Sequence, residues 1–373
     1  MALALIAGAL ANKPGSGGEA WVRLSWVLGL QRLGWQVHLV ERLSGEDTAA
    51  RCYFEEVVGR SGLEGRASLL DAEGRALYGQ DERELLAVAA EADLLFNVSG
   101  HLGAGSLLDA PRRRVYVDLD PGFTQAWHAD PSLEFTVDGH DLYLTVGQNV
   151  GKPGCPVPVS GIEWTPTLPP VLLDRWTPAP TPEGTLTFTT VATWRSPYGG
   201  LEIDGREMGL KHHQFRRFAT LPELVEGAEF ELALDIHPGD AADLEMLRSH
   251  GWKLVDPGAA AGTPEAFREY VRGSGAEFSV AQGVYVEAAT GWFSDRTAAY
   301  LACGRPAVVQ ETGLGGLGFP GLQAFADLEA AVTAAESVRD GYEEHAAAAR
   351  AFAEGHLDSD RVLGRVLDLV GRG

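Results

Sequence analysis

Six prolines lie within residues 166–182, and they separate two halves of the chain that show the same alternation of strands and helices. They are Pro166, Pro169, Pro170, Pro178, Pro180 and Pro182. Such a density breaks regular secondary structure and is typical of a semi-rigid connector. A chain of 373 residues is also long for one hydrophobic core. We therefore predict a first domain over residues 1–165, a proline-rich hinge over 166–183 and a second domain over 184–355.

The first half opens with a strand, a glycine-rich turn, a helix and a second strand. The strand runs from Leu3 to Ala7, the turn ends at Gly18, the helix spans Glu19 to Leu33, and the second strand spans Gln36 to Val40. Further strands are predicted from Asp93 to Phe96, Arg114 to Val117 and Leu142 to Val146, with a helix from Arg83 to Glu91. Alternating strands and helices predict a parallel sheet covered on both faces.

The alternation restarts after the prolines. Strands are predicted at 186–191, 230–236, near 253 and at 277–280, and helices from about residue 212, at 241–249 and at 264–272. The alanine-rich end of the chain has helical periodicity, and we expect its last segment, 356–373, to cross the hinge and pack on the first domain. The pattern thus predicts an α/β protein with two Rossmann-like, doubly wound domains that face a cleft.

Charge and cysteine content restrict the environment and partners of the protein. The net charge is −22, which opposes attraction to nucleic acid or anionic lipid, so we expect neither as a partner. The three cysteines lack metal-site spacing and are too few for a disulfide framework, as in a cytoplasmic protein. The apolar start, Met1 to Leu10, has no basic region before it, so we interpret it as a buried strand rather than a signal peptide. No segment has the roughly 18 to 20 apolar residues of a membrane span.

The glycine-rich turn places the backbone amides of Gly17 and Gly18 at a helix N-terminus, where an anion is favoured. The alternative is that the glycines only shape a turn and bind nothing. A Rossmann dehydrogenase is a rival interpretation, because Glu41 ends the second strand where an acid would hold a ribose. The loop from Ala9 to Gly18, however, lacks the compact GxGxxG spacing.

The richest motif lies in the second domain. A polar loop from Gly283 to Thr297 precedes a short alanine-rich helix, a Gly304-Arg305-Pro306 turn and a buried strand that ends in polar residues. Ser294 or Asp295 can cap the helix. Ligands of open α/β sheets bind at the carboxyl ends of strands, so these polar clusters predict a binding site.

The segment from Leu301 to Val309 resembles the Ala-x-Gly-x-Pro-Val-Val turn of the donor domain of GT-B glycosyltransferases. The resemblance implies the GT-B fold and a nucleoside-diphosphate sugar as co-substrate. It assigns donor binding to Ser294, Asp295, Arg296 and Thr297, with Gln310 and Glu311 on the sugar side. Arg195 and Lys211 resemble the Arg and Lys with which members of this fold neutralise the diphosphate without a metal. Their spacing is longer than in the family, and a solvated surface role is the alternative for both.

Three residues of the first domain are candidate catalytic groups. Glu19 follows Gly18 at the position of the catalytic histidine in inverting relatives, although a first-turn glutamate is also favoured by the helix dipole. His101 lies where retaining relatives often have a histidine near the donor sugar. Asp120 follows another strand and is a second candidate base. With Asp118 it also forms the DxD pattern of metal-binding GT-A transferases, or a simple Asx cap before Pro121.

These observations predict a glycosyltransferase that moves a sugar from a nucleoside diphosphate to an unidentified acceptor, with no metal and no further cofactor. Glu287 and Asp295 have the spacing of the paired acids of retaining enzymes, but Ala299 stands where the family has its second acid. The stereochemical outcome is therefore left open. A nucleotide-sugar epimerase of the same fold and a non-catalytic nucleotide-sugar binding protein are the alternatives.

Overall fold

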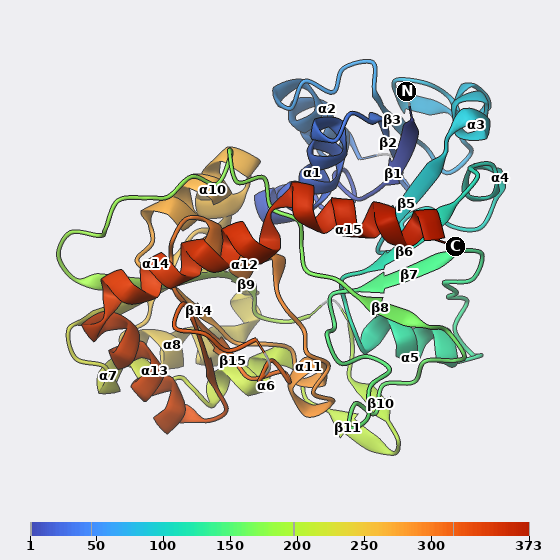
Figure 1. Ribbon diagram of the computed structural model, residues 1–373. Coiled ribbons are helices and arrows are strands. Elements are labelled where there is room, and N and C mark those ends of the chain that lie inside the picture. Colours follow the sequence, from blue (N-terminus) through green and yellow to red (C-terminus); the bar gives the residue numbers. More distant parts are fainter. Residues whose placement is uncertain (1, 46, 197, 316, 373) are drawn as a thin grey trace.

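The computed structural model describes residues 2–45, 47–196, 198–315 and 317–372. It contains two α/β halves, each built on a mainly parallel sheet, and the helices at the C-terminal end pass from the second half to the first (Figure 1). None of the helices in the described residues is long and apolar enough to cross a membrane.

The first half is built on an eight-stranded sheet in the order β4-β3-β2-β1-β5-β6-β7-β8. Its strands are β1 (Leu3–Ala7), β2 (Gln36–Arg42), β3 (Ala67–Leu70), β4 (Ala76–Tyr78), β5 (Leu94–Val98), β6 (Arg114–Asp118), β7 (Leu142–Thr145) and β8 (Trp164–Pro166). Only β4 pairs antiparallel, at the edge beside β3. The chain reverses its direction of travel across the sheet between β1 and β5, which are paired neighbours. This switch point is where open α/β sheets bind ligands.

Helices cover both faces of this sheet. They are α1 (Gly17–Arg32), α2 (Thr48–Arg60), α3 (Glu82–Glu91), α4 (Ser106–Asp109) and α5 (Phe123–Ala129). Along α1 the buried residues recur on almost every side, because the sheet, the second half and the C-terminal helix all pack against it. This enclosure explains a helix with little amphipathic pattern.

The second half repeats the topology with six parallel strands in the order β13-β12-β9-β14-β15-β16. They are β9 (Leu186–Thr193), β12 (Ala228–Asp235), β13 (Lys253–Val255), β14 (Ala276–Ser279), β15 (Ala307–Gln310) and β16 (Leu322–Phe325). The helices of this half are α6 (Lys211–Arg216), α7 (Leu221–Leu224), the 3₁₀ turn η1 (Pro238–Asp240), α8 (Ala241–Ser249), α9 (Pro257–Ala261), α10 (Pro264–Gly273), α11 (Gly283–Glu287), α12 (Asp295–Ala302) and α13 (Leu328–Asp340). A hairpin of β10 (Leu201–Ile203) and β11 (Arg206–Met208) leaves this half and contacts α5 of the first.

The chain returns to the first half through α14 (Tyr342–Phe352), the π-helical turn η2 (Ala353–Leu357) and α15 (Ser359–Arg372). The linker meets this turn, because Val171 N–H donates to the carbonyl of Leu357 and Ser359 N–H donates to that of Val171. Helix α15 lies on α1 so closely that a Cβ added at Gly29 would be 2.5 Å from Leu363 Cδ1. The predicted packing of the C-terminal helix on the first domain is therefore confirmed (Figure 1).

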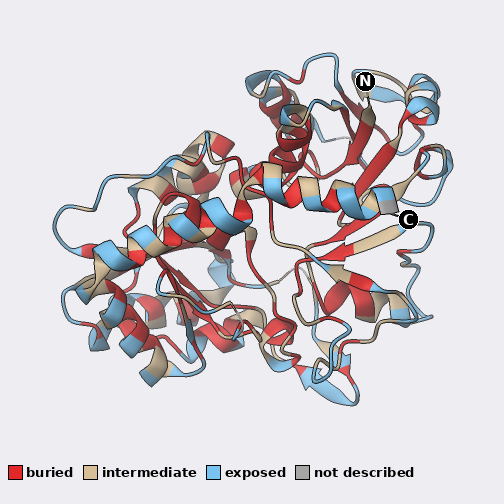
Figure 2. Cartoon of the chain, viewed as in Figure 1, coloured by how far each residue is buried: buried red, intermediate tan, exposed pale blue. Residues whose placement is uncertain are grey.

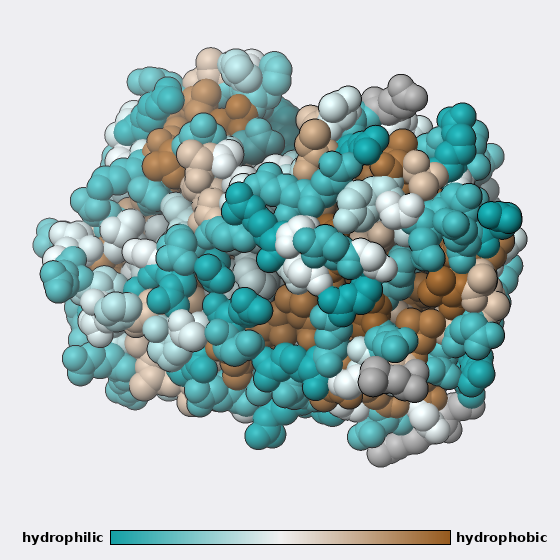
Figure 3. Space-filling model, turned by 90° about the horizontal axis from the view of Figure 1, so that it is seen from above, coloured by the Kyte–Doolittle hydropathy of each residue, from teal (hydrophilic) through white to brown (hydrophobic). Residues whose placement is uncertain are grey.

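The buried side chains follow the two sheets and the helices between them (Figure 2). One hydrophobic cluster combines residues of both halves, including Trp21 and Trp176 with Phe267. On the face seen from above, hydrophobic residues are visible only as separate patches among hydrophilic ones (Figure 3).

Two features differ from the sequence prediction. The segment 283–297 was expected to be a polar loop, but α11 occupies its start, because Val284 and Tyr285 are buried at the junction of the halves. Strands β3, β4, β8, β10, β11 and β16 were not predicted; each has only three or four residues, and β8 ends where the proline-rich hinge was expected to begin.

Candidate functional site

A cavity of about 640 Å³ lies between the two halves, at the carboxyl ends of their central strands. Its first wall comes from the loop after β1, the start of α1 and the loops after β5 and β6. Its second wall comes from the end of β9 and the starts of α6, α9 and α12. Both switch points therefore contribute to one site of a size typical for small molecules.

Hydrogen bonds also join the two halves directly. The backbone N–H groups of Gln148 and Asn149 donate to the carbonyls of Gly291 and Thr290. The Asn149 side-chain amide donates to the carbonyls of Ala289 and Gly313, at 3.0 and 2.9 Å. This contact lies next to Trp292, which lines the cavity.

The wall of the second half carries two cations, Lys211 and Arg296. Within the described residues, Lys211 Nζ has no hydrogen-bond or ion-pair partner, although the residue is only partly exposed. Burial, and then the neighbouring Arg296, lower the pKa of Lys211 to about 7. A lysine without a partner beside a second cation is stabilised in its charged form by a bound anion, so this wall suits an anion.

Arg296 is fixed by the strand ends beneath it. Its Nε donates to Glu277 at 2.7 Å, and its two terminal nitrogens donate to Val191 O and Ser279 Oγ at 2.8 and 2.6 Å. A guanidinium has five N–H groups, so two remain for a ligand. Because Glu277 is fully buried and holds the arginine, the guanidinium is positioned before any ligand arrives.

Helix α12 begins at the cavity. Ser294 caps it by accepting a hydrogen bond from Arg296 N–H, as the sequence predicted for Ser294 or Asp295. Burial and the Glu19 carboxylate raise the pKa of Asp295 to about 6. The N-terminal end of the helix dipole adds to the positive potential of this wall.

Asp120 is the carboxylate of the first wall whose environment most resembles that of a base. Burial and the neighbouring Asp118 raise its pKa to about 6. Tyr285, from the second half, donates its hydroxyl hydrogen to Asp120 Oδ1 at 2.9 Å. Asp120 Oδ2 has no hydrogen-bond donor within the described residues, so it is free to accept a proton.

Asp118 itself holds the local structure. Its carboxylate accepts hydrogen bonds from Thr124, Gln125 and Thr145, at 2.7, 2.8 and 2.7 Å. It is fully buried and absent from the cavity wall. The interpretation of Asp118 and Asp120 as a metal-binding DxD pair therefore does not fit, because Asp118 is occupied by these donors.

Glu19 and His101 lie together on the first wall. Glu19 forms an ion pair with Arg23, one turn along α1. Burial raises the pKa of Glu19, but Arg23 and Lys13 outweigh it and hold the pKa below its ordinary value. Burial, with Arg23 and Lys13, lowers the pKa of His101 to about 4, so the imidazole is neutral at pH 7.

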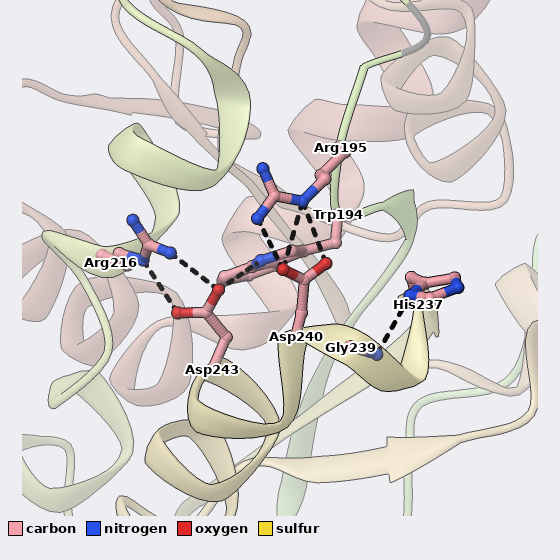
Figure 4. Close-up of polar contacts among 7 residues, drawn as sticks. All are labelled: Trp194, Arg195, Arg216, His237, Gly239, Asp240 and Asp243. Carbon is pink, nitrogen blue, oxygen red and sulfur yellow. Dashed lines mark hydrogen bonds and ion pairs between the residues drawn. The ribbon is translucent and has the colours of Figure 1, made fainter.

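The structure does not bring Arg195 to the cavity. The side chain is 54% exposed and donates to both carboxylate oxygens of Asp240 (Figure 4). Beside it, Arg216 pairs with Asp243, which also accepts from the Trp194 indole (Figure 4). Arg195 thus belongs to a surface cluster at η1 and α8.

Four other predicted donor residues lie outside the cavity wall: Gly17, Thr297, Gln310 and Glu311. Gln310 bonds to Ala281 N–H and to the Gln214 side chain, and Glu311 accepts from the backbone of Gly313 and Leu314. Gly17 lies against the backbone of Thr263, at the contact between the halves. The cavity wall does include Gly18, Glu19, His101, Asp120, Lys211, Ser294, Asp295 and Arg296.

Glu41 does not form a ribose site. Its buried carboxylate accepts from the backbone N–H groups of Leu10, Ala11 and Asn12, at 2.7, 3.0 and 2.7 Å. The loop after β1 therefore folds over Glu41, and this acid is not available to bind a ribose as it would in a Rossmann dehydrogenase.

Sequence reasoning missed several cavity residues, among them Lys13, Arg23 and Tyr285. Lys13 was visible as the basic residue after the first strand, and Arg23 as the i+4 partner of Glu19. Tyr285 gave no local signal, because its partner Asp120 is 165 positions away.

No protein-family model and no curated protein matches this sequence. Solved structures match over the whole chain. HepE from Anabaena, in complex with UDP and glucose, has a TM-score of 0.63 at 13% identity, covering 100% of both chains. An alpha-glucosyltransferase in complex with UDP-glucose and DNA containing an abasic site has a TM-score of 0.61 at 14% identity, covering 99% of this chain and 98% of the other. At such identities the likeness shows the fold alone, and this fold is GT-B.

Proposed function

We propose that this protein is a glycosyltransferase that takes its sugar from a nucleoside-diphosphate donor bound in the interdomain cavity. The observation that carries the proposal is Lys211, a partly buried ammonium without a partner in the described residues, beside the anchored Arg296. The fold agrees, because HepE and the alpha-glucosyltransferase, which share it, were solved as complexes with UDP or UDP-glucose.

The proposed donor site is the wall of the second half. Lys211 and Arg296 neutralise the diphosphate, the α12 N-terminus with Ser294 adds its dipole, and Gly18 and Asp295 flank the donor. The two cations supply the charge that a metal would otherwise provide, so we propose a reaction without a metal or further cofactor. Arg195, Gly17, Thr297, Gln310 and Glu311 are left outside this site.

Asp120 is the proposed base. Its free Oδ2 accepts the proton of an acceptor hydroxyl, while the oxygen of that hydroxyl bonds to the anomeric carbon of the sugar. The bond between this carbon and the phosphate oxygen breaks, and its electron pair leaves with the nucleoside diphosphate. Glu19, paired with Arg23, and the neutral His101 position the sugar between the walls.

Two further proposals concern the cellular compartment of the protein and the size of its acceptor. All three cysteines are free, and Cys52 is exposed, which supports a reducing cytoplasm. The net charge of −22 supports a small acceptor rather than nucleic acid.

A thermal-shift titration with nucleoside diphosphates and nucleotide sugars tests the proposal. A donor at a hundredfold excess over its Kd adds about 2.7 kcal/mol of stability and raises the unfolding midpoint. We expect Lys211→Met to weaken this binding by about tenfold or more, because a charge-assisted hydrogen bond contributes about 1.5–3 kcal/mol.

Arg195→Ala is the matched control, since it also removes one cation but lies outside the cavity. We expect its response to equal that of the wild type. No response to any nucleotide, or equal loss in both variants, contradicts the proposed donor site. Conversion of the donor to another nucleotide sugar without an acceptor indicates an epimerase instead.

A further inference from the structure

Several aromatic side chains line the cavity, and none of them belongs to the proposed donor site. They include those of Tyr116, Trp127, Phe135, Tyr198, Tyr285 and Trp292. The centroids of Trp127 and Tyr198 are 4.6 Å apart at 70°, and those of Trp127 and Phe135 are 5.7 Å apart at 75°. Both pairs pack edge to face, an arrangement typical of aromatic clusters.

The aromatic rings lie beside Asp120. Tyr285 holds Asp120 Oδ1, and Phe123 connects Tyr285 to Tyr198, with ring centroids 6.1 and 5.2 Å away. Asp120 also raises the pKa of Tyr198, after the larger effect of burial, so the two side chains are electrostatic neighbours. A ring bound here therefore brings its substituents close to the proposed base.

Two hydroxyl groups near these rings are already engaged in hydrogen bonds. The Thr124 hydroxyl already donates to Asp118, and the Tyr285 hydroxyl already donates to Asp120. His101 instead interacts electrostatically with Arg23, Lys13 and Glu19. A planar ring gains from contact with the faces of these rings, because aromatic pairs stabilise each other beyond the effect of the area that they bury.

We propose, building on the glycosyl transfer proposed above, that the acceptor is a small phenol whose ring lies among Trp127, Phe135 and Tyr198 and whose hydroxyl meets Asp120. The phenol oxygen bonds to the anomeric carbon, its proton passes to Asp120 Oδ2, and the nucleoside diphosphate leaves with the electron pair of the broken bond. Phenols lose a proton at pH about 10, far more readily than sugar hydroxyls, so a carboxylate base suffices.

The test compares three acceptors with the best nucleotide sugar from the thermal-shift screen: 4-methylumbelliferone, methyl glucoside and a short DNA duplex. Glycoside products are measured by mass spectrometry, and KM is measured for the phenol. We expect product from the phenol, a KM several-fold to about tenfold higher in Trp127→Ala, and near wild-type KM in Trp127→Phe. Donor-induced stabilisation is measured on each variant, and we expect it to be unchanged.

Two results overturn the inference while leaving the proposed function intact. One is donor binding without product from the phenol, with or without transfer to methyl glucoside or DNA. The other is phenol transfer with equal KM in wild type and Trp127→Ala. Failure of every nucleotide to stabilise the wild type is a separate result, which overturns the proposed function and this inference together.

Discussion

Two carboxyl groups of the cavity, those of Asp120 and Asp295, have a higher pKa than an ordinary aspartate. Burial raises the pKa of both to about 6. Asp118 adds to the effect at Asp120, and Glu19 adds to it at Asp295. Glu19 itself stays ionised, because Arg23 compensates its charge. The site thus has two acids that titrate near neutral pH and one that does not.

This difference predicts the pH dependence of activity. Asp120 binds a proton below about pH 6 and cannot then accept another, so kcat/KM is expected to rise with pH through about 6 and to fall above about 7, where Lys211 loses its charge. Asp120→Asn is expected to lower kcat by roughly 10²–10⁴-fold and to abolish the acidic limb. Steady-state kinetics from pH 5 to 8 measure both.

Asp295→Asn separates the two acids, because Asp295 titrates in the same range. We expect this variant to retain the acidic limb. A limb that persists in Asp120→Asn but disappears in Asp295→Asn assigns the base to Asp295 instead.

At the scale of elements, the N-terminus of α1 is the contact on which the cavity depends. A Cβ at Gly17 would lie 2.0 Å from Thr263 O and 2.9 Å from Ala261 O, both backbone atoms of the second half. Nearby, the Trp21 indole donates to Pro264 O at 2.7 Å. Glycine at 17 therefore permits the two halves to approach, whereas the sequence suggested an anion-binding amide there.

Gly17→Ala is expected to lower the free energy of unfolding by about 1–3 kcal/mol, because the backbone must shift to admit the methyl group. Urea denaturation measures it. Gly59→Ala is the matched control: it lies in α2 with no backbone atom within 4 Å of the added Cβ. We expect that change to be neutral or to stabilise by up to about 1 kcal/mol. Equal midpoints for the two variants would show that the contact at Gly17 does not constrain the halves.

The molecule as a whole is strongly acidic, with 52 Asp and Glu against 30 Lys and Arg. Its cavity is more balanced in charge, because four cations, Lys13, Arg23, Lys211 and Arg296, stand there with four carboxylates, Glu19, Asp120, Asp235 and Asp295. The net charge of the protein therefore repels a polyanion, whereas Lys211 and Arg296 give one wall of the cleft the charge to bind a small one.

We expect no measurable binding of duplex DNA at physiological salt, even though one solved structure of the same fold is a complex with DNA. Fluorescence anisotropy with a short labelled duplex measures this, and a nucleoside diphosphate titrated in the same buffer is the positive control. Binding that weakens as salt rises would contradict the expectation, since it would reveal a basic surface that contacts phosphates.

The sequence alone determined the order of most strands and helices, the two-domain pattern and the fold. Strands such as β1 and helices such as α8 were predicted at their observed bounds, because their periodicity is local. It also identified the polar residues at strand ends, since parallel strands bring their carboxyl ends to one edge.

Only the tertiary structure decided which charged side chains remain available to bind a ligand. Arg195 is paired with Asp240, 45 positions away, while Lys211 has no partner within the described residues. Likewise, the pKa of the Asp120 carboxyl depends on burial, which raises it, and on the hydrogen bond from Tyr285, 165 positions away, which lowers it. Secondary structure follows from neighbours along the chain, but desolvation and ion pairing depend on neighbours in space.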